Sequence, residues 1–424
     1  MTSKIHLYAF YTLVALIGVI LPGCRTVEGL PECTDPIGCI TIAPDEPIKL
    51  AVLQTLSGDS AVGGIEQTNV TKLLLAKRNY EFLDHPVELQ IEDELCTPEG
   101  GANAALKVIA DPQIVAILGT TCSGSAKTAS PIMSEAGLVM ISSSNTAPAL
   151  TALEEGKVGK DWYPGYFRVI YNDAIAGKTA AQFAIDELGI EKAATLDDGS
   201  FYAQQLTLAF SEAFEKLGGK HVLNTSIDVD AEDMSPFLEA IENSKAEFVF
   251  MPILADPAAR ILKQVENFPN ISGVNGKEVI FFVAEELISE PFIQDTGDDG
   301  IGVYFAGPSP LSNTHNDELA TTYENEYGEV PSTIFFSFAS DATRLLLRAI
   351  AKTAVPASDG SLIIGHQALR DTLYNTKNFD GITGSLNCDE FGDCGVANFS
   401  IVQLTNPSTG VEGLKQNVVY TYTP

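Results

Sequence analysis

Residues 114–146 read IVAILGTTCSGSAKTASPIMSEAGLVMISSSNT, and this stretch decides the fold. An apolar run at 114–118 is followed by small and hydroxyl residues, a helix-like segment at 125–136 and a second apolar run at 138–141. Strand, helix and strand in this order form the unit of a parallel sheet, because two parallel strands need a crossover connection. The stretch therefore predicts a βαβ unit within a doubly wound sheet.

The same alternation extends in both directions along the chain, and it restarts after Arg168. Two successive halves of one architecture predict two doubly wound, Rossmann-like α/β lobes. In the first half we expect strands at 48–55 and 87–93 and helices at 65–78 and 98–110. In the second half we expect helices at 175–188, 202–217, 235–242 and 257–265, with strands at 193–196, 221–226, 248–251 and 279–283. Three further helices are expected at 317–327, 337–354 and 366–374, before a β-rich end.

The N-terminus has the pattern of a secretory signal. Lys4 precedes an almost wholly apolar run at 7–21, which ends in Leu21-Pro22-Gly23-Cys24. The run is shorter than the roughly 20 apolar residues of a membrane span. Leu-x-Gly-Cys resembles the bacterial lipobox, which predicts a lipoprotein signal peptide at 1–23 and a lipidated Cys24; the alternative is an ordinary signal peptide with an unrelated cysteine. Residues 24–47 are rich in Pro, Gly, Thr and Asp and are expected to form a tether.

The amino-acid composition argues against nucleic acids as partners. The chain has 56 acidic and 25 basic residues and a formal net charge of −31. Such a surface repels phosphate backbones, so we expect no nucleic-acid binding. The acidic residues are dispersed and 45% of the residues are hydrophobic, which suits two folded lobes.

Seven cysteines point to an oxidising compartment. Without Cys24 six remain, which is an even number. Cys33 with Cys39 and Cys388 with Cys394 each enclose five residues, so local bridges are the simplest assignment and leave Cys96 with Cys122. Metal binding is the competing interpretation, but C-x5-C is not a usual zinc spacing and no histidine lies near either local pair. We expect three disulfides and no metal.

Signatures of catalysis are missing from the sequence. It contains no phosphate-binding G-x-x-x-x-G-K-[ST] loop, no H-E-x-x-H, no G-x-S-x-G and no C-x-x-C. Residues 295–300 begin like a calcium loop, but the twelfth position is Ala306, where a bidentate acid is required. We therefore expect a binding protein with no cofactor.

Two polar loops are the best candidates for a site. Thr120–Ser125 and Ser142–Thr146 each follow a predicted strand. In open α/β sheets ligands bind beyond the carboxyl ends of the strands, and hydroxyls with N–H groups at a helix N-terminus suit a carboxylate. Either loop alone could serve only as a helix cap. Two such loops after successive strands favour a joint site.

Ordered motifs along the chain resemble one family, the amino-acid-binding proteins of branched-chain amino-acid ABC transporters, which are type I periplasmic binding proteins. The likeness covers about Ile48 to Tyr422. It rests on the following motifs: Leu56-Ser57-Gly58, Gly119–Ser123, Met140–Pro148, Phe167-Arg168, Asp197-Asp198 with Tyr202, Ser340-Asp341-Ala342 and Phe379–Gly384.

The resemblance implies two lobes joined by three crossings, near Arg168–Asp173, Val303–Gly307 and Thr383–Leu386. Lobe one would then comprise 48–168 and 306–383, and lobe two 169–305 and 384–424.

The same resemblance implies a set of ligand-binding residues. Ser123 matches the family's carboxylate-binding serine, and Tyr202 matches the aromatic residue of the second lobe. Ser144 and Thr146 match a small residue that contacts through its backbone and a threonine. Glu285 matches the acid for the ligand ammonium, with Glu286 as the alternative register. The family also has a cysteine pair at a spacing close to that of Cys96 and Cys122.

The resemblance implies an extracytoplasmic, lipid-anchored receptor that passes an amino acid or related small polar solute to an ABC permease. A ligand-sensing receptor module is the alternative. Two positions lack the family's usual aromatics, at Val62-Gly63-Gly64 and at Pro252–Ala255. A non-amino-acid solute, such as an amide or small carboxylic acid, therefore stays open.

Overall fold

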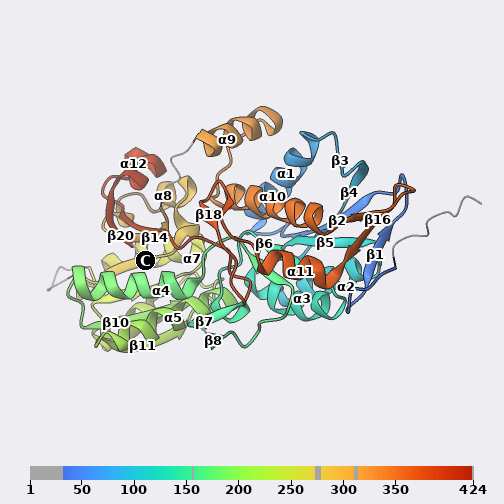
Figure 1. The fold of residues 1–424 in the computed structure, drawn as a ribbon. Helices are drawn as coiled ribbons and strands as arrows, with labels where there is room; N and C mark the ends of the chain where they lie inside the picture. The colour runs from blue at the N-terminus through green and yellow to red at the C-terminus, as the bar shows by residue number, and fades with distance from the viewer. Residues whose placement is uncertain (1–31, 155–156, 273–277, 310–313, 423–424) are drawn as a thin grey trace, which may run out of the picture.

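Two α/β lobes lie side by side in the computed structural model (Figure 1). It describes residues 32–422, apart from 155–156, 273–277 and 310–313. Cys24 and the predicted signal peptide lie outside the described residues. Within these described residues, each lobe is built on one large sheet, of six strands in the first lobe and seven in the second. The predicted fold class, two doubly wound lobes, is confirmed.

The first sheet has the strand order β3-β4-β2-β5-β6-β9 and is parallel except for β3. In β2, Leu50 and Val52 pack on one face and Ala51 and Leu53 on the other. Both faces are buried, which explains the uninterrupted apolar run. The strands are β2 (Ile48–Gln54), β3 (Glu81–Phe82), β4 (His85–Asp93), β5 (Ile114–Gly119), β6 (Met140–Ser142) and β9 (Tyr166–Arg168).

Helices cover both faces of the first sheet. Two pack against Ala51 and Leu53, and three others pack against or beside the opposite face. A sixth helix lies outside these three and packs against one of them. The first two are α2 (Pro98–Ile109) and α3 (Ser123–Glu135); the next three are α1 (Ala61–Ala76), α10 (Phe335–Thr353) and α11 (His366–Tyr374); the outer one is α9 (Thr314–Tyr327).

The second sheet has the order β11-β10-β12-β13-β14-β19-β20. The strands from β11 to β14 pair in parallel, and β19 runs antiparallel to both of its neighbours, β14 and β20. Phe248, Phe250 and Phe282 face a helix that contributes Phe210, with ring centroids 4.7 Å apart for Phe210 and Phe250. The strands are β10 (Lys192–Asp197), β11 (Lys220–Ser226), β12 (Phe248–Phe250), β13 (Ile280–Val283), β14 (Tyr304–Pro308), β19 (Phe399–Gln403) and β20 (Val418–Tyr422).

Helices also cover both faces of the second sheet. One face carries α4 (Asp173–Gln182) and α5 (Phe201–Lys216). The opposite face, which includes Val249, carries α6 (Ser235–Ser244), α7 (Ala255–Gln264), α8 (Glu290–Thr296) and the short α12 (Gly410–Gln416).

Part of the expected tether is folded. Residues 39–42 form β1 (Cys39–Ile42), which pairs antiparallel with β16 (Leu362–Gly365) beside the first lobe. Ile40 and Ile42 alternate into the core, which explains why this stretch adopts a strand. The composition of 24–47 concealed that alternation.

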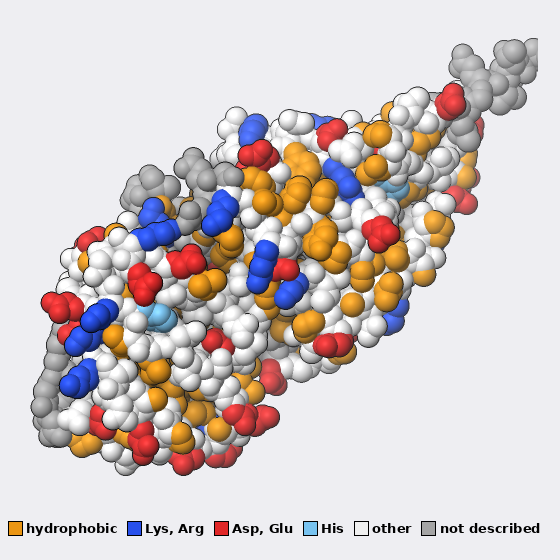
Figure 2. All heavy atoms as spheres, turned by 90° about the horizontal axis from the view of Figure 1, so that it is seen from below, with side chains coloured by type: hydrophobic (Ala, Val, Ile, Leu, Met, Phe, Trp, Pro, Cys, Tyr) orange, Lys and Arg blue, Asp and Glu red, His pale blue; other side chains and the backbone are white. Residues whose placement is uncertain are grey.

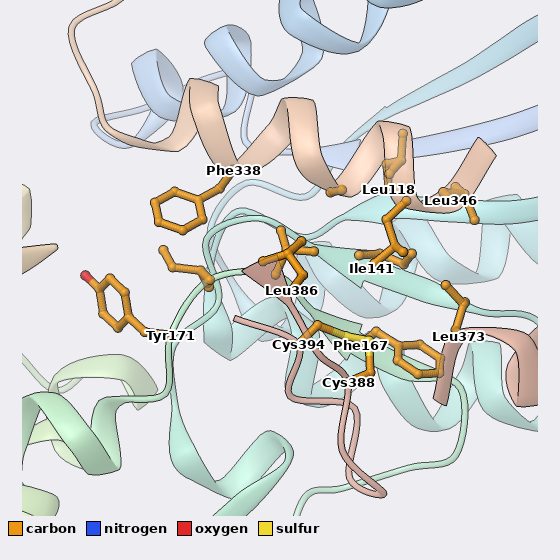
Figure 3. Packing of buried hydrophobic residues seen from close by; sticks show 14 of the residues in the cluster. Leu118, Ile141, Phe167, Tyr171, Phe338, Leu346, Leu373, Leu386, Cys388 and Cys394 are labelled. Carbon is orange, nitrogen blue, oxygen red and sulfur yellow. A yellow bond between two sulfur atoms is a disulfide. The ribbon is translucent and has the colours of Figure 1, made fainter. Parts of the chain in front are cut away.

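Two edges of the lobes also differ from the expected ranges. Residues 306–308 belong to β14 and pair with β19 in the second sheet, because the apolar strand continues past the expected crossing. Residues 384–394 pack on the first lobe, where Cys394 N donates to the Arg168 carbonyl oxygen at 2.9 Å. Figure 3 shows the Cys388–Cys394 disulfide beside Phe167 of the first lobe.

Charged residues are spread over the surface. On the face in Figure 2 acidic and basic side chains are interspersed. Within the described part of the chain, no helix combines the length and apolarity needed to cross a membrane.

Candidate functional site

The two lobes meet where several parallel strands end, and the predicted site residues lie there. Asp173 N, at the start of α4, donates to the Thr146 carbonyl oxygen of the first lobe at 3.0 Å. Glu285 lies two residues after the end of β13 and begins a short 3-10 turn, and Tyr202 lies in the first turn of α5. Thr146, Tyr202 and Glu285 therefore converge from both lobes around Asp173.

Ser123 and Ser144 belong to the neighbouring loops of the first lobe and are both buried. Ser123 Oγ accepts from the N–H of Ala147, the residue after Thr146, at 3.4 Å. Ser144 Oγ lies 2.9 Å from the Thr121 carbonyl oxygen and 3.2 Å from Gln67 Oε1. Because acceptors inside the lobe already engage the Ser144 hydroxyl, this residue would serve a ligand through its backbone.

Among the described residues, four polar atoms around Asp173 make no hydrogen bond of normal length and geometry. They are both carboxylate oxygens of Asp173 and the hydroxyls of Tyr171 and Tyr202, and all are buried. The Tyr171 ring packs edge-on against Phe338 and Phe399, and its hydroxyl points away from the hydrophobic side chains labelled in Figure 3. Leaving each such group unpaired costs about 1–3 kcal/mol, so their convergence makes this cluster the candidate site for a polar ligand.

The electrostatics of this cluster favour a cation. Burial raises the pKa of Asp173 well above its usual value, and the Glu285 carboxylate raises it further. The Thr146 hydroxyl and Arg168 act in the opposite direction. Burial also raises the pKa of Glu285, against the effect of the Tyr171 hydroxyl. Arg168 is already paired with Asp393, so a cationic ligand group would supply the charge that these two acids lack.

Glu285, rather than Glu286, is the buried acid of the pair. The Glu285 side chain lies beside Tyr171, Asp173 and Tyr202, whereas Glu286 is exposed. Protein nevertheless surrounds the Glu286 carboxyl closely enough to raise its pKa to about 8, with added repulsion from Glu285. The structure thus favours Glu285 in the register that the sequence left open.

The buried Glu94 carboxylate stabilises the loop that leads to Ser123. Glu94 accepts hydrogen bonds from Thr55 Oγ1 at 2.6 Å and from the N–H groups of Cys96, Thr121 and Cys122 at 3.1–3.2 Å. Burial raises the pKa of Glu94, and these hydrogen bonds oppose the rise. All three expected disulfides are present, and the Cys96–Cys122 bridge joins the same two loops. Carboxylate and bridge together hold Ser123 in place.

Replacing both Cys96 and Cys122 by serine is expected to lower the free energy of unfolding by roughly 3 kcal/mol. The physical reason is that the bridge closes a loop between residues 26 apart in sequence and so restricts the unfolded chain. Denaturant titration of the double variant against wild type measures the loss. A loss below about 1 kcal/mol would show that the Glu94 network alone maintains the loop.

Three residues of the site escaped the sequence analysis: Tyr171, Asp173 and Gln67. Asn172 caps α4 through its side chain, and Asp173 then occupies the first helical turn, where acidic residues are common. That local pattern indicates helix capping and nothing more. A usable signal was the position of Asp173 within the expected crossing 168–173, since a crossing residue is close to both lobes.

Comparison with known proteins agrees with this architecture. A family model described as periplasmic binding protein matches residues 47–408. The Leu/Ile/Val-binding protein of Escherichia coli is 27% identical over 234 residues, which are 54% of this chain and 61% of that protein. The chain therefore spans about three fifths of that relative's length. A leucine-, isoleucine-, valine-, threonine- and alanine-binding protein of Pseudomonas aeruginosa is 22% identical over 87% of this chain and 92% of its own length.

Solved structures share the fold. A leucine-binding protein from Thermotoga maritima superposes with a TM-score of 0.70 at 22% identity, covering 85% of this chain and 96% of that one. A solute-binding protein of an ABC transporter from R. palustris, in complex with 4-hydroxybenzoate, gives a TM-score of 0.72 at 18% identity and covers 89% and 97%. One of these neighbours is thus named for an amino acid and the other is in complex with an aromatic acid.

Proposed function

This chain belongs to the periplasmic binding protein family, and on that premise we propose that it is the extracytoplasmic solute receptor of an ABC importer. It captures an amino acid between its lobes, releases it unchanged and passes it to a membrane permease. The observation that carries the choice of solute is the buried Asp173 carboxylate, which lies beside Glu285 and the Tyr171 and Tyr202 hydroxyls. Its oxygens make no hydrogen bond of normal length and geometry among the described residues.

An α-amino acid matches the charges of both lobes. Its ammonium would pair with Glu285 and Asp173, and the hydroxyls of Tyr171 and Tyr202 would complete the polar shell. Its carboxylate would accept from Ser123, from Thr146 and from backbone N–H groups of the Ser123 and Ser144 loops. Such charge-assisted hydrogen bonds are about twice as strong as neutral ones. One solute would thereby touch both lobes and favour the closed state.

A small aromatic carboxylic acid is the second candidate. The structural likeness to a 4-hydroxybenzoate complex favours it, as does the absence of the family's usual aromatics near Val62 and Pro252. An aromatic acid brings no cation, so Asp173 and Glu285 would have to stay protonated around it. Their raised pKa values make this possible but give the acid no ionic partner.

A thermal-shift panel separates the two candidates. The purified protein is heated with each of the common L-amino acids, with benzoate and with 4-hydroxybenzoate. A solute at a hundred times its dissociation constant adds roughly 2.7 kcal/mol of stability, which raises the unfolding temperature by about 5 °C or more. We expect an amino acid to give this shift. A shift with the benzoates alone would contradict the amino acid and favour a small aromatic carboxylic acid as the solute.

Binding of the amino acid is expected to weaken as the pH falls. An ammonium needs ionised partners, and the raised pKa values of Asp173 and Glu285 mean that both acids take up protons above the usual carboxyl range. The empty protein has the opposite trend: the folded state retains protons that the unfolded state has lost, so its stability falls as the pH rises through the raised pKa values. Calorimetry and thermal unfolding between about pH 5 and about pH 8 test both slopes. A flat affinity profile would contradict the pairing.

The lipid anchor is a further part of the proposal. Leu21–Cys24 supplies the lipobox pattern at the end of the apolar run 7–21. Mass spectrometry of membrane-extracted protein is expected to find a diacylglyceryl Cys24 as the first residue. A mature N-terminus at any other residue would remove the anchor from the proposal.

A further inference from the structure

Residues beside the candidate site, rather than in it, join the two lobes directly. Phe201 is the first residue of α5 in the second lobe, next to Tyr202. An ideal Cβ at Gly124, on α3 of the first lobe, would lie 3.7 Å from the Phe201 Cβ and 3.9 Å from Pro98 Cγ. The Lys127 ammonium lies 4.7 Å from the centre of the Phe201 ring. One aromatic side chain of the second lobe therefore rests on a surface of the first.

That surface is continuous with a hydrophobic core. Phe201 packs against the cluster of the first lobe that includes Ala104, Ala105 and Ala126 from α2 and α3. It is the residue of α5 that joins this cluster, although the rest of the helix packs mainly in the second lobe. The Cys96–Cys122 bridge and Glu94 hold the adjacent loops, so the surface is stiff. A stiff apolar surface suits repeated docking.

We propose that Phe201 is a closing contact, a positioning residue that docks on Gly124 and Lys127 and sets the balance between open and closed lobes. Its neighbour Tyr202 directs a hydroxyl into the candidate site, so docking of Phe201 and covering of the solute occur in one movement. This inference rests on the proposed function for its purpose, but the contact itself needs no solute. When the closed state is rare, apparent affinity falls in proportion to its population.

The residues opposite Phe201 fit this contact. A Cβ at residue 124 would make ordinary van der Waals contacts with Phe201 Cβ and Pro98, so this position has room for a small side chain. Lys127 adds a cation–π attraction that is worth roughly a two- to five-fold change in an equilibrium at a partly exposed position. Removing the Phe201 ring is expected to cost more, about tenfold in the closed population, because closing then buries less apolar area.

A crosslink tests the geometry without any solute. Disulfides form where two Cβ atoms lie about 3.5–4.5 Å apart, and the Gly124 and Phe201 positions meet this condition. The Gly124→Cys/Phe201→Cys variant is oxidised mildly, and peptide mapping identifies the 124–201 bond. The matched control is Gly124→Cys/Leu208→Cys, since Leu208 is 47% exposed and two turns further along α5. We expect the first pair to crosslink about tenfold faster or more.

Solution scattering tests the consequence. Phe201→Ala is expected to raise the radius of gyration of the solute-free protein, with Lys127→Met giving a smaller rise and Leu208→Ala none. The thermal unfolding midpoint of each variant shows that it remains folded. Equal crosslinking of the two cysteine pairs, or an unchanged radius of gyration in Phe201→Ala, would overturn the inference. Because neither measurement uses a solute, a wrong solute assignment would leave both results unaffected.

Discussion

Amino-acid binding is expected to disappear in Glu285→Ala. A bound ammonium would lose its counter-charge in a buried site, which costs roughly 3–5 kcal/mol, or about a few hundred to a few thousand-fold in the dissociation constant. Glu285 is almost fully buried, so no water could readily take the place of its carboxylate. Calorimetry with the amino acid that shifts the wild type most in the thermal panel measures the loss.

Two further variants sharpen this result. Asp173→Asn keeps the shape of the side chain but removes its charge, and we expect a loss of similar order. Glu286→Ala is the matched control, because Glu286 is adjacent in sequence yet exposed, and its removal should change affinity far less. If Glu285→Ala binds the solute as tightly as wild type does, the ammonium assignment is wrong and the solute has no amino group at that position.

The fold could be predicted from the sequence because the spacing of apolar residues within a helix or strand is a local property. The alternation of apolar runs and helices predicted both sheets, and Glu285 was found through the resemblance to the family, whose acidic residue it matches. The exceptions occur at segment ends. Residues 39–42 contain only two buried isoleucines, too few to stand out from their Pro- and Gly-rich surroundings.

The site was only partly predictable for a different reason. Asp173 lies next to a helix cap, and its neighbours in sequence explain it fully without any ligand. Its importance comes from Glu285 and Tyr202, which the chain reaches much later and which approach it only when the lobes meet. Repulsion between charged residues that are far apart in sequence leaves no pattern in a short stretch of sequence, so it could not be predicted there. Phe201 and Gly124 are a second example, since each belongs to an ordinary helix start.

A buried guanidinium forms the junction between the lobes at the first crossing. The Arg168 side chain has no exposed area, and its Nε donates to Asp393 Oδ1 while its terminal nitrogens donate to Thr151 Oγ1 and to two carbonyl oxygens. Asp393 also accepts from Asn172 Nδ2 at 3.0 Å, just before α4 begins. Burial alone would lower the pKa of Arg168, but Asp393 more than offsets it and raises the pKa. The pair thus fastens the Cys388–Cys394 loop to the first crossing.

Arg168→Met is therefore expected to lower the free energy of unfolding by roughly 3–5 kcal/mol, because it leaves Asp393 without its ionic partner and removes one donor from each of two buried carbonyl groups. Denaturant titration measures this as a lower midpoint. Lys263→Met is the matched control: Lys263 and Asp295 form an ion pair with 41% and 55% exposed side chains, and such pairs contribute about 1 kcal/mol or less. The double variant Arg168→Met/Asp393→Leu should recover part of the loss, since an apolar pair leaves no charge unpaired. Equal effects of Arg168→Met and Lys263→Met would show that burial of the guanidinium does not govern stability at this junction.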